Sequence, residues 1–230
     1  MDVMEIEIYQ IKDAEKKQMV AKALSDRPGF TAPEPVDPSM YHRVFMGDVE
    51  CKSPYELVFL FNTVGHRLFR GEKLGLSDVI RIKSLSEDVC FLYDRIGVSL
   101  IEFDTEKVLP EENVIRVLVV EPHRIPFESE IENTLEGEQK AVEGLIQYIY
   151  NGDGTITVIN DESKLNGMEG NRRVKGDVLV GPFFIAGDNG ETLCSLTDEQ
   201  MSYYAERFAE PEEISREEIE EHCKMMFFSW

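Results

Sequence analysis

The sequence predicts an α+β fold of two small modules, each a short mixed or antiparallel sheet with packed helices. Strand-like segments with alternating or β-branched residues recur in both halves of the 230-residue chain, and segments with helix-capping patterns lie between them. A charged segment that contains Pro110, residues 106–113, separates the halves. The hydrophobic content of 42% is enough to build a core in each module.

The first half is predicted to begin with a strand at Met4–Ile11, where apolar and polar residues alternate. Good helix formers at Ala14–Leu24 predict a helix with one buried stripe. The next segment, Arg27–Ser39, has four prolines and a glycine and is predicted to be a loop. A strand at Tyr41–Phe45 is expected to follow this loop.

A capped helix is predicted next. Ser53 is a preferred N-cap residue, Pro54 suits the first helical position and Glu56 suits the third, so we expect a helix that continues through Asn62. The remaining strand-like segments of this half are Ser77–Ile82, Val89–Tyr93 and Gly97–Phe103.

The second half contains the strongest strand pattern, VIRVLVV at Val114–Val120. Its nearly unbroken apolar run predicts a central strand that is buried on both faces. Apolar residues roughly three and four positions apart predict one helix over Asn133–Tyr150. The turn residues Asn151–Gly154 then lead into a β-branched strand at Thr155–Ile159.

A further strand is predicted at Asp177–Ile185, where Gly181-Pro182 indicates a bulge or an edge. The capping-box pattern TDEQ begins a helix at Thr197–Phe208, and a last helix is expected at Ser215–Phe228. The predicted division of the chain is a first module at residues 1–105, a second module at 112–209 and an acidic C-terminal helix at 210–230.

The chain carries 24 basic and 45 acidic side chains, which gives a formal net charge of −21. Such a chain repels nucleic acid and anionic lipid headgroups and attracts basic protein surfaces. Residues 1–104 hold 13 basic and 18 acidic side chains, so they contribute −5 and the remainder contributes −16. The acidity therefore belongs mostly to the second half. A general role in solubility is an equally good explanation of the total charge.

The cysteine pattern predicts no metal site, because none of the four cysteines forms a CxxC pair; they are Cys51, Cys90, Cys194 and Cys223. No cofactor is predicted either. The first residues are acidic and alternating, unlike a signal peptide, and no apolar run approaches the about 20 residues of a membrane helix. We expect a cytoplasmic protein with free thiols and no membrane contact.

Four segments of the first half resemble the YodL-like domain that recurs in polyvalent proteins of phages and conjugative elements. The similar segments are IEIYQIKD at 6–13, LFN at 60–62, FRGEKLGLSDVI at 69–80 and YDRIGV at 93–98. The resemblance covers nearly the whole of the first predicted module.

The second half resembles another family, an uncharacterised one from the same mobile elements. The similar segments are VLVVEP at 117–122, NTLEGEQKAVEGLIQ at 133–147, INDESKLNGMEGNR at 159–172, GDVLVGPFFI at 176–185 and SLTDEQ at 195–200. Neither resemblance implies an established reaction. Both imply a genomic neighbourhood of antirestriction and other counter-defence proteins, which does not by itself fix a function.

Acidic residues are concentrated in two segments of the second half, 128–143 and 198–221. Between Asp198 and Glu221 there are ten acidic side chains against Arg207 and Arg216. On a helix, carboxylates three and four positions apart would form a ridge that imitates a nucleic-acid backbone. A solvated helix face is the alternative. The carboxylates predicted to bind a partner are Glu128, Glu130, Glu132, Glu210, Glu213, Glu217, Glu220 and Glu221.

The segment that most resembles a ligand site is 160–172, which combines amides, carboxylates and cations with two glycines. Such groups on a loop can hold a phosphate or a nucleotide. The alternative is that the asparagines cap turns and the cations pair with local carboxylates. The predicted ligand-binding residues are Asn160, Glu162, Lys164, Asn171 and Arg172.

No arrangement of residues indicates catalysis. The four histidines are scattered, and Ser77-Asp78 lacks both a nucleophile elbow and a partner histidine, so we interpret this pair as an N-cap or the entry to a strand. We therefore predict no catalytic residue and no enzyme. The apolar C-terminus, residues 225–230, is expected either to dock on the body of the protein or to bind a partner.

The sequence thus favours an interaction protein. The leading hypothesis is a counter-defence protein of the anti-CRISPR or antirestriction type, whose acidic face imitates nucleic acid and inhibits a host defence protein with a basic nucleic-acid-binding surface. Direct binding of nucleic acid is not expected. The alternatives are a binding protein or enzyme for a small ligand or nucleotide signal, which would use residues 160–172, and a protein–protein adaptor.

Overall fold

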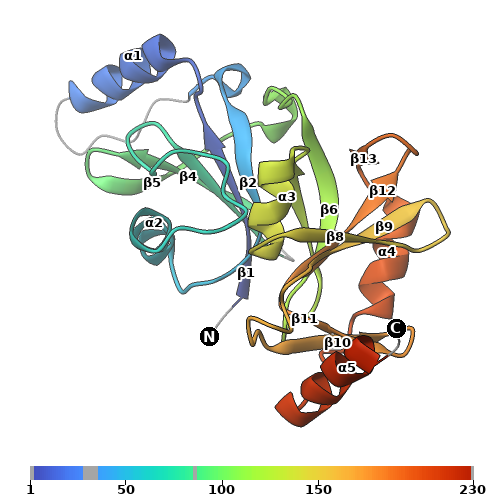
Figure 1. Cartoon of the computed structure of the whole chain (residues 1–230). Coiled ribbons are helices and arrows are strands. Elements are labelled where there is room, and N and C mark those ends of the chain that lie inside the picture. The colour runs from blue at the N-terminus through green and yellow to red at the C-terminus, as the bar shows by residue number, and fades with distance from the viewer. Residues whose placement is uncertain (1–2, 28–35, 85–86, 229–230) are drawn as a thin grey trace. The chain divides into compact units, whose positions relative to one another are not determined.

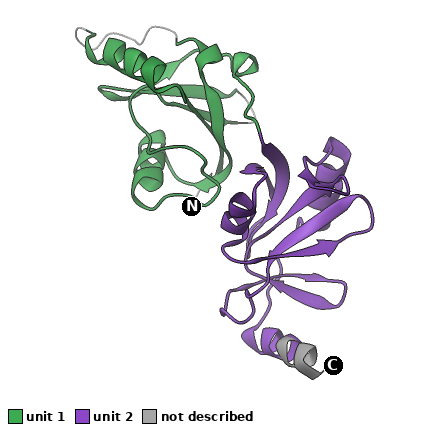
Figure 2. Ribbon diagram, turned by 45° about the horizontal axis from the view of Figure 1, so that its top comes forward, with its two compact units in different colours: residues 1–112 green, residues 113–230 purple. Residues whose placement is uncertain are grey.

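The computed structural model describes residues 3–27, 36–84 and 87–228, with side chains up to residue 222. The chain divides into two compact units, residues 1–112 and 113–230 (Figure 2). Each unit is built from antiparallel strands with helices packed against them (Figure 1). The α+β fold predicted from the sequence is therefore confirmed.

The first unit has a five-stranded antiparallel sheet in the order β2-β1-β3-β4-β5. Its elements, in chain order, are β1 (Val3–Gln10), α1 (Ala14–Ser25), the 3-10 turn η1 (Pro38–Met40), β2 (His42–Glu50), α2 (Pro54–Thr63), β3 (Val79–Lys83), β4 (Val89–Asp94), β5 (Gly97–Ile101) and η2 (Thr105–Lys107). The helices and strands predicted for this half are present. The predicted loop at 27–39 lies mostly outside the described residues.

Side chains of β1 alternate between the two faces of this sheet. On one face, Tyr9 packs in a cluster with Leu24 of α1. On the other face, Ile8 lies opposite Phe45 of β2, and the Phe45 ring meets the ring of Phe61 in α2 at a centroid distance of 4.9 Å. The two helices therefore cover opposite faces of the sheet.

The segment predicted to be a linker, 106–113, packs on the first unit over most of its length. The Leu109 amide donates to the Tyr41 carbonyl at 2.9 Å, and η2 precedes this contact. The two units meet in sequence between Glu112 and Asn113.

The second unit has a six-stranded sheet in the order β7-β6-β12-β9-β8, with β13 paired to β12, and a separate β10-β11 hairpin. Its elements, in chain order, are β6 (Val114–Val120), β7 (Phe127–Glu132), α3 (Leu135–Val142), β8 (Ile146–Tyr150), β9 (Thr155–Asn160), β10 (Gly170–Val174), β11 (Asp177–Val180), β12 (Phe183–Asp188), β13 (Leu193–Cys194), α4 (Asp198–Arg207) and α5 (Arg216–Phe228).

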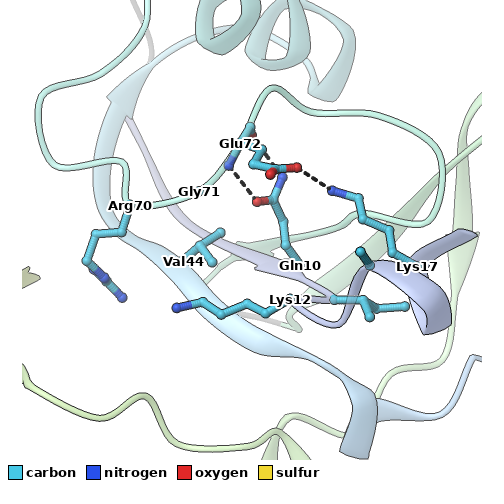
Figure 3. A pocket seen from close by; sticks show the side chains of 9 residues that line it. Gln10, Lys12, Lys17, Val44, Arg70, Gly71 and Glu72 are labelled. Carbon is cyan, nitrogen blue, oxygen red and sulfur yellow. Dashed lines mark hydrogen bonds and ion pairs between the residues drawn. The ribbon is translucent and has the colours of Figure 1, made fainter.

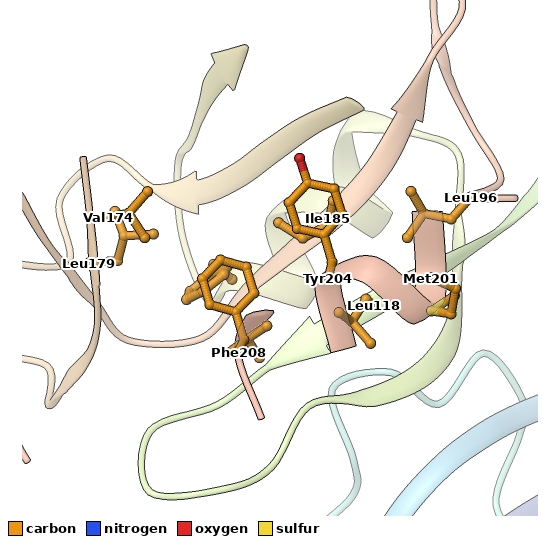
Figure 4. Close-up of a cluster of buried hydrophobic side chains, with 10 residues drawn as sticks. Leu118, Val174, Leu179, Ile185, Leu196, Met201, Tyr204 and Phe208 are labelled. Carbon is orange, nitrogen blue, oxygen red and sulfur yellow. The ribbon is translucent and has the colours of Figure 1, made fainter. Parts of the chain in front are cut away.

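β6 is an interior strand that is buried on both faces, as its apolar run predicts. Leu118 and Val120 join the cluster formed with Met201 and Tyr204 of α4 (Figure 4). Val117 and its neighbours on the other face alternate away from this cluster, toward the face on which α3 packs against β9 and β12. The sheet is thus covered by one helix on each face.

The predicted turn and capping box of this unit are also confirmed. Gly152 and Gly154 have φ values of +85° and +79°, which glycine adopts without strain. The Thr197 hydroxyl accepts from the Gln200 amide, and the Gln200 side chain accepts in return from the Thr197 amide. The Tyr204 hydroxyl donates to Asp153 at 2.7 Å, so α4 is fastened to the turn at 151–154.

The single helix predicted over 133–150 is wrong. The helix α3 ends at Val142, because Glu143 adopts a left-handed conformation with φ +60° and its amide donates back to the Gln139 and Lys140 carbonyls. The residues that follow form the edge strand β8. Their sequence, IQYIY, is rich in β-branched and aromatic residues, and this preference outweighs the helix-like spacing.

The interruption at Gly181-Pro182 is neither a bulge nor an edge, so that prediction is also wrong. Gly181 has φ +73°, and the chain there leaves the β10-β11 hairpin and enters β12 in the middle of the large sheet. Alternate residues of β11 face opposite sides: Leu179 joins the α4 cluster, and Val178 packs with Ile219 of α5. The hairpin therefore carries α5 on its outer side.

The left-handed Glu143 generates a stability prediction. Glu143→Gly is expected to raise the free energy of unfolding by about 0.5 kcal/mol, because the relief of about 1–2 kcal/mol of left-handed strain exceeds the flexibility cost of about 0.5–1 kcal/mol. The same change inside the helix, Glu136→Gly, is expected to cost about 1 kcal/mol. Urea unfolding followed by circular dichroism measures both variants. A loss of stability in both would show that α3 does not end at residue 142.

Candidate functional site

The C-terminal acidic segment, residues 209–222, is fastened to the β10-β11 hairpin by ion pairs. Arg173 of β10 donates through Nε and Nη2 to the Glu218 carboxylate, both at 2.7 Å, and through Nη1 to Glu212 at 2.7 Å. The Arg173 guanidinium lowers the pKa of the Glu218 carboxyl. One arginine therefore holds the segment at two points six residues apart.

Apolar contacts hold the same segment from beneath. Ile219 packs with Val178 and Val180 of β11. Ile214 lies directly over Gly170, where a Cβ atom would come within 2.5 Å of the Ile214 Cβ. Gly170 is thus required for the close approach of this segment to the hairpin.

The exposed side of the segment is strongly negative. Residues 209–222 contain seven carboxylates, whereas the guanidinium groups in contact with them are those of Arg173 and Arg216. Two guanidinium groups neutralise at most two of the seven carboxylates, so the segment keeps an excess of negative charge. The carboxylates that face solvent are Glu210, Glu213, Glu217, Glu220 and Glu221.

The predicted helical ridge through these five residues is only partly present. The helix α5 begins at Arg216, so Glu210 and Glu213 lie in the extended chain before it. Glu213 instead lies 3.4 Å from Nδ1 of His123, which also approaches Glu169 at 3.5 Å. The carboxylates form a continuous acidic segment without a single helical spacing.

The second predicted acidic group, on β7, is partly neutralised. Glu128, Glu130 and Glu132 alternate outward as a strand requires. Arg116 of the neighbouring β6 forms an ion pair with Glu128 and a second one with Asp198 at 2.6 Å. The C-terminal acidic segment is therefore the stronger candidate for binding a basic partner.

The predicted ligand residues in 160–172 point mainly into the protein. Asn160 is buried, and its amide donates to the Val142 and Glu143 carbonyls at 3.2 and 3.0 Å while its oxygen accepts from the Glu162 amide. Lys164 donates to Asp177 at 2.6 Å. The exposed side chain in this set is Glu162.

Asn171 and Arg172 are on β10 and are 0% and 1% exposed. The Arg172 guanidinium donates to the Phe208 carbonyl at 2.9 Å and to the Arg124 carbonyl at 2.8 Å. Burial lowers the pKa of Arg172. The alternative interpretation thus holds for Lys164, which pairs with a local carboxylate, but not for Arg172, whose partners include backbone carbonyls and no carboxylate.

In the first unit, the segments that carry the YodL-like resemblance converge on one loop, residues 69–78. The Gln10 carboxamide binds both the amide and the carbonyl of Glu72, each at 2.9 Å. The Asn62 carboxamide binds the amide and the carbonyl of Leu74 at 2.7 and 2.9 Å. Each carboxamide thus forms the two hydrogen bonds that a neighbouring strand would otherwise form with the backbone of this loop.

The loop closes at Ser77-Asp78, which directly precedes β3, so the strand-entry alternative is the one found. Asp78 is 0% exposed and accepts from the Gly75 amide at 2.9 Å and from Gln10 at 2.8 Å. Burial raises the pKa of Asp78 to about 6. The Tyr93 amide and carbonyl pair with Asp78 and Ser77, so the fourth similar segment also contacts this loop.

A pocket of about 320 Å³ lies beside this loop. Its lining includes Gln10, Lys12 and Lys17 from the β1–α1 junction and Arg70 and Glu72 from the loop (Figure 3). Sequence analysis missed this site. The signal was present in the two similar segments QIKD and FRGE, whose cations are brought together only by the fold.

The cysteines and the other features considered in the sequence form no further candidate site among the described residues. Cys51 and Cys90 are buried free thiols, and burial raises the pKa of each. Within residues 3–27, 36–84 and 87–222, no group of three or more acidic, histidine or cysteine side chains is placed to hold a metal ion. No helix in the described part of the chain is long and apolar enough to cross a membrane. The apolar side chains of 225–230 lie outside the described residues.

The fold and these sites define a tandem of two antiparallel α+β domains with an acidic surface on the second. Residues 5–103 match the family model described as the YodL-like domain, and residues 115–209 match DUF3846, a domain of unknown function. Each unit is thus similar to one of these two families over most of its length, and α5 lies beyond the second match. Searches of curated proteins and of solved structures each found no match.

Two neighbouring arginines test the role of β10. Arg172→Ala is expected to lower the free energy of unfolding by about 3 kcal/mol, because it leaves a void and buried carbonyls without donors. Arg173→Ala removes the same charge from an exposed position and is expected to change the unfolding midpoint little. Urea unfolding of both variants measures the difference. Equal stability of the two would show that the Arg172 side chain is not structural and would restore it as a ligand-binding candidate.

Proposed function

We propose that this chain is a counter-defence interaction protein that binds a basic surface of a host nucleic-acid-targeting enzyme through its C-terminal acidic segment. The bound segment would occupy a site that normally receives nucleic acid, as an anti-CRISPR or antirestriction inhibitor does. The mobile-element context implied by the YodL-like resemblance supports this class of partner, and the electrostatics of the second unit support the mode of binding.

The observation that carries the proposal is that the acidic segment is fixed in place. Arg173 holds Glu212 and Glu218, and Ile214 and Ile219 are packed on the hairpin. A fixed set of carboxylates binds without the cost of ordering a free tail. Its field also speeds the encounter with a positively charged partner.

The spacing of these charges is compatible with a nucleic-acid channel. On a helix such as α5, side chains three and four positions apart are separated by about 5–6 Å at Cβ. Successive phosphates of one DNA strand rise by about 3.4 Å along the duplex axis. Basic side chains that are arranged to bind DNA phosphates can also reach carboxylates at the helical spacing, because lysine and arginine stems are long and flexible.

A matched pair of charge-reversal variants tests the proposal. The test variant changes Glu213, Glu217 and Glu220 to Lys. The control variant changes three exposed carboxylates of the first unit, Glu50, Glu102 and Glu112, to Lys. Both take the formal net charge from −21 to −15, because each of three changes adds two charges.

Immobilised protein is used to capture enzymes from a host lysate at low salt, and each captured nuclease is assayed for nucleic-acid binding. Wild-type protein and the control variant are expected to retain and inhibit the same enzyme, whereas the test variant loses both. Affinity should fall steeply with salt, as it does for contacts between basic groups and phosphates. Undiminished inhibition by the test variant would refute the proposed surface.

A further inference from the structure

The pocket of the first unit has a charge opposite to that of the chain. Three cationic side chains line it, those of Lys12, Lys17 and Arg70, against one carboxylate, that of Glu72. The Glu72 side chain is 85% exposed, so much of its charge is screened by water. The lining thus carries an excess of positive charge in a protein whose net charge is −21.

Lys17 is weakly held. Its Nζ atom lies 3.4 Å from Glu72 and 3.8 Å from Asp78, and both distances exceed those of strong charge-assisted hydrogen bonds. The Asp78 carboxylate is fully buried, and its Oδ1 atom has no hydrogen-bond partner. A ligand anion at the pocket would therefore displace no strong contact of Lys17.

The other two cations converge on a carboxylate of the chain itself. Glu111 pairs with Lys12 and accepts from Nε of Arg70 at 3.0 Å, and only 6% of its side chain is exposed. This internal anion lies beside the pocket and demonstrates that Lys12 and Arg70 can together hold an oxyanion. The Lys12 side chain is 53% exposed and is therefore able to turn toward the pocket.

The backbone at the pocket is held rigidly. A Cβ atom at Gly71 would come within 2.4 Å of the Gln10 side-chain oxygen and 2.8 Å of the Phe69 ring. The Gln10 carboxamide fixes the next residue, Glu72, at both its amide and its carbonyl. The Arg70 side chain is only 4% exposed, and its Nη2 donates to the Arg43 carbonyl at 2.7 Å, so its guanidinium borders the pocket from a fixed position and loses little entropy on binding.

We infer that this pocket binds the phosphoryl group of a small molecule through Lys12, Lys17 and Arg70. Lysine and arginine are the common ligands of phosphate in proteins, and three cations from two separate segments match a dianion. The volume of about 320 Å³ is at the lower end for small-molecule sites, which indicates phosphate itself or a small phosphate monoester. Glu111 competes with the ligand for two of the three cations.

The first arm of the test uses two neighbouring lysines of α1. Isothermal titration calorimetry of the full chain with inorganic phosphate and with glycerol phosphate is run at constant ionic strength, with sodium sulfate as a reference anion. Lys17→Met is expected to weaken binding about tenfold, which is typical for the loss of one charge-assisted hydrogen bond. Lys16→Met removes the same charge from an exposed position outside the pocket and is expected to change the affinity less than about twofold.

The second arm uses two neighbouring glutamates, so a folding defect cannot imitate the result. Glu111→Gln removes the internal competitor and is expected to tighten phosphate binding several-fold. Glu112→Gln makes the same charge change at an exposed position and is expected to leave the affinity nearly unchanged. Tighter binding of glycerol phosphate than of phosphate would identify a small-molecule site, and equal binding would identify a site for the ion; both support the inference.

Two results would overturn the inference. One is the absence of saturable binding of either phosphate compound to wild-type protein at millimolar concentration. The other is equal affinity within each matched pair, Lys17→Met with Lys16→Met and Glu111→Gln with Glu112→Gln. Because the pocket belongs to the first unit, a failure of this inference would not bear on the function proposed for the acidic segment of the second unit.

Discussion

The second unit depends on one buried cation. The Arg172 guanidinium donates to carbonyls of Arg124, in the loop after β6, and of Phe208, at the end of α4. Because Arg172 is itself on β10, it joins three segments that are distant in sequence. The C-terminal acidic segment begins at the residue after Phe208. A side chain that is only 1% exposed therefore fixes the point from which the acidic segment leaves the core, and with it the surface on which its carboxylates lie.

In the first unit, neutral side chains hold the irregular backbone next to the candidate site. Its loop at 69–78 has no regular backbone pairing, and Gln10 and Asn62 supply the missing partners from β1 and α2. A buried backbone without partners would be costly, so these carboxamides decide whether the loop has one conformation. In both units, a buried polar side chain from a strand holds irregular backbone next to the candidate site: Gln10 holds Glu72, and Arg172 holds Phe208. The geometry of each candidate site is therefore determined by a side chain that is anchored in a sheet.

Local sequence patterns correctly predicted the elements whose structure depends on neighbouring residues in the chain. The buried strand β6, the cap at Ser53 and the turn at 151–154 depend on neighbouring residues, and all three were predictable. The helix expected through Tyr150 is wrong because residues 146–150 prefer a strand and pair with β9, and the helical spacing of the apolar residues does not reveal this pairing. The buried position of Arg172 could not be predicted for a similar reason. Its partners are backbone carbonyls 36 and 48 positions away, and no sequence pattern distinguishes such an arginine from one that binds a ligand.

Net charge was informative only after its partners were located. In the first unit, Glu7 is 1% exposed and is paired with Arg43 and Arg81, so acidic and basic side chains largely neutralise each other inside the unit. In the C-terminal acidic segment, the carboxylates outnumber their partners and face water. The field of paired charges falls off over a few ångströms, whereas unpaired charges of one sign act over about a Debye length, near 8 Å at physiological salt. A basic macromolecule would therefore respond to the second unit, and a small anion would respond only after it had reached the pocket of the first.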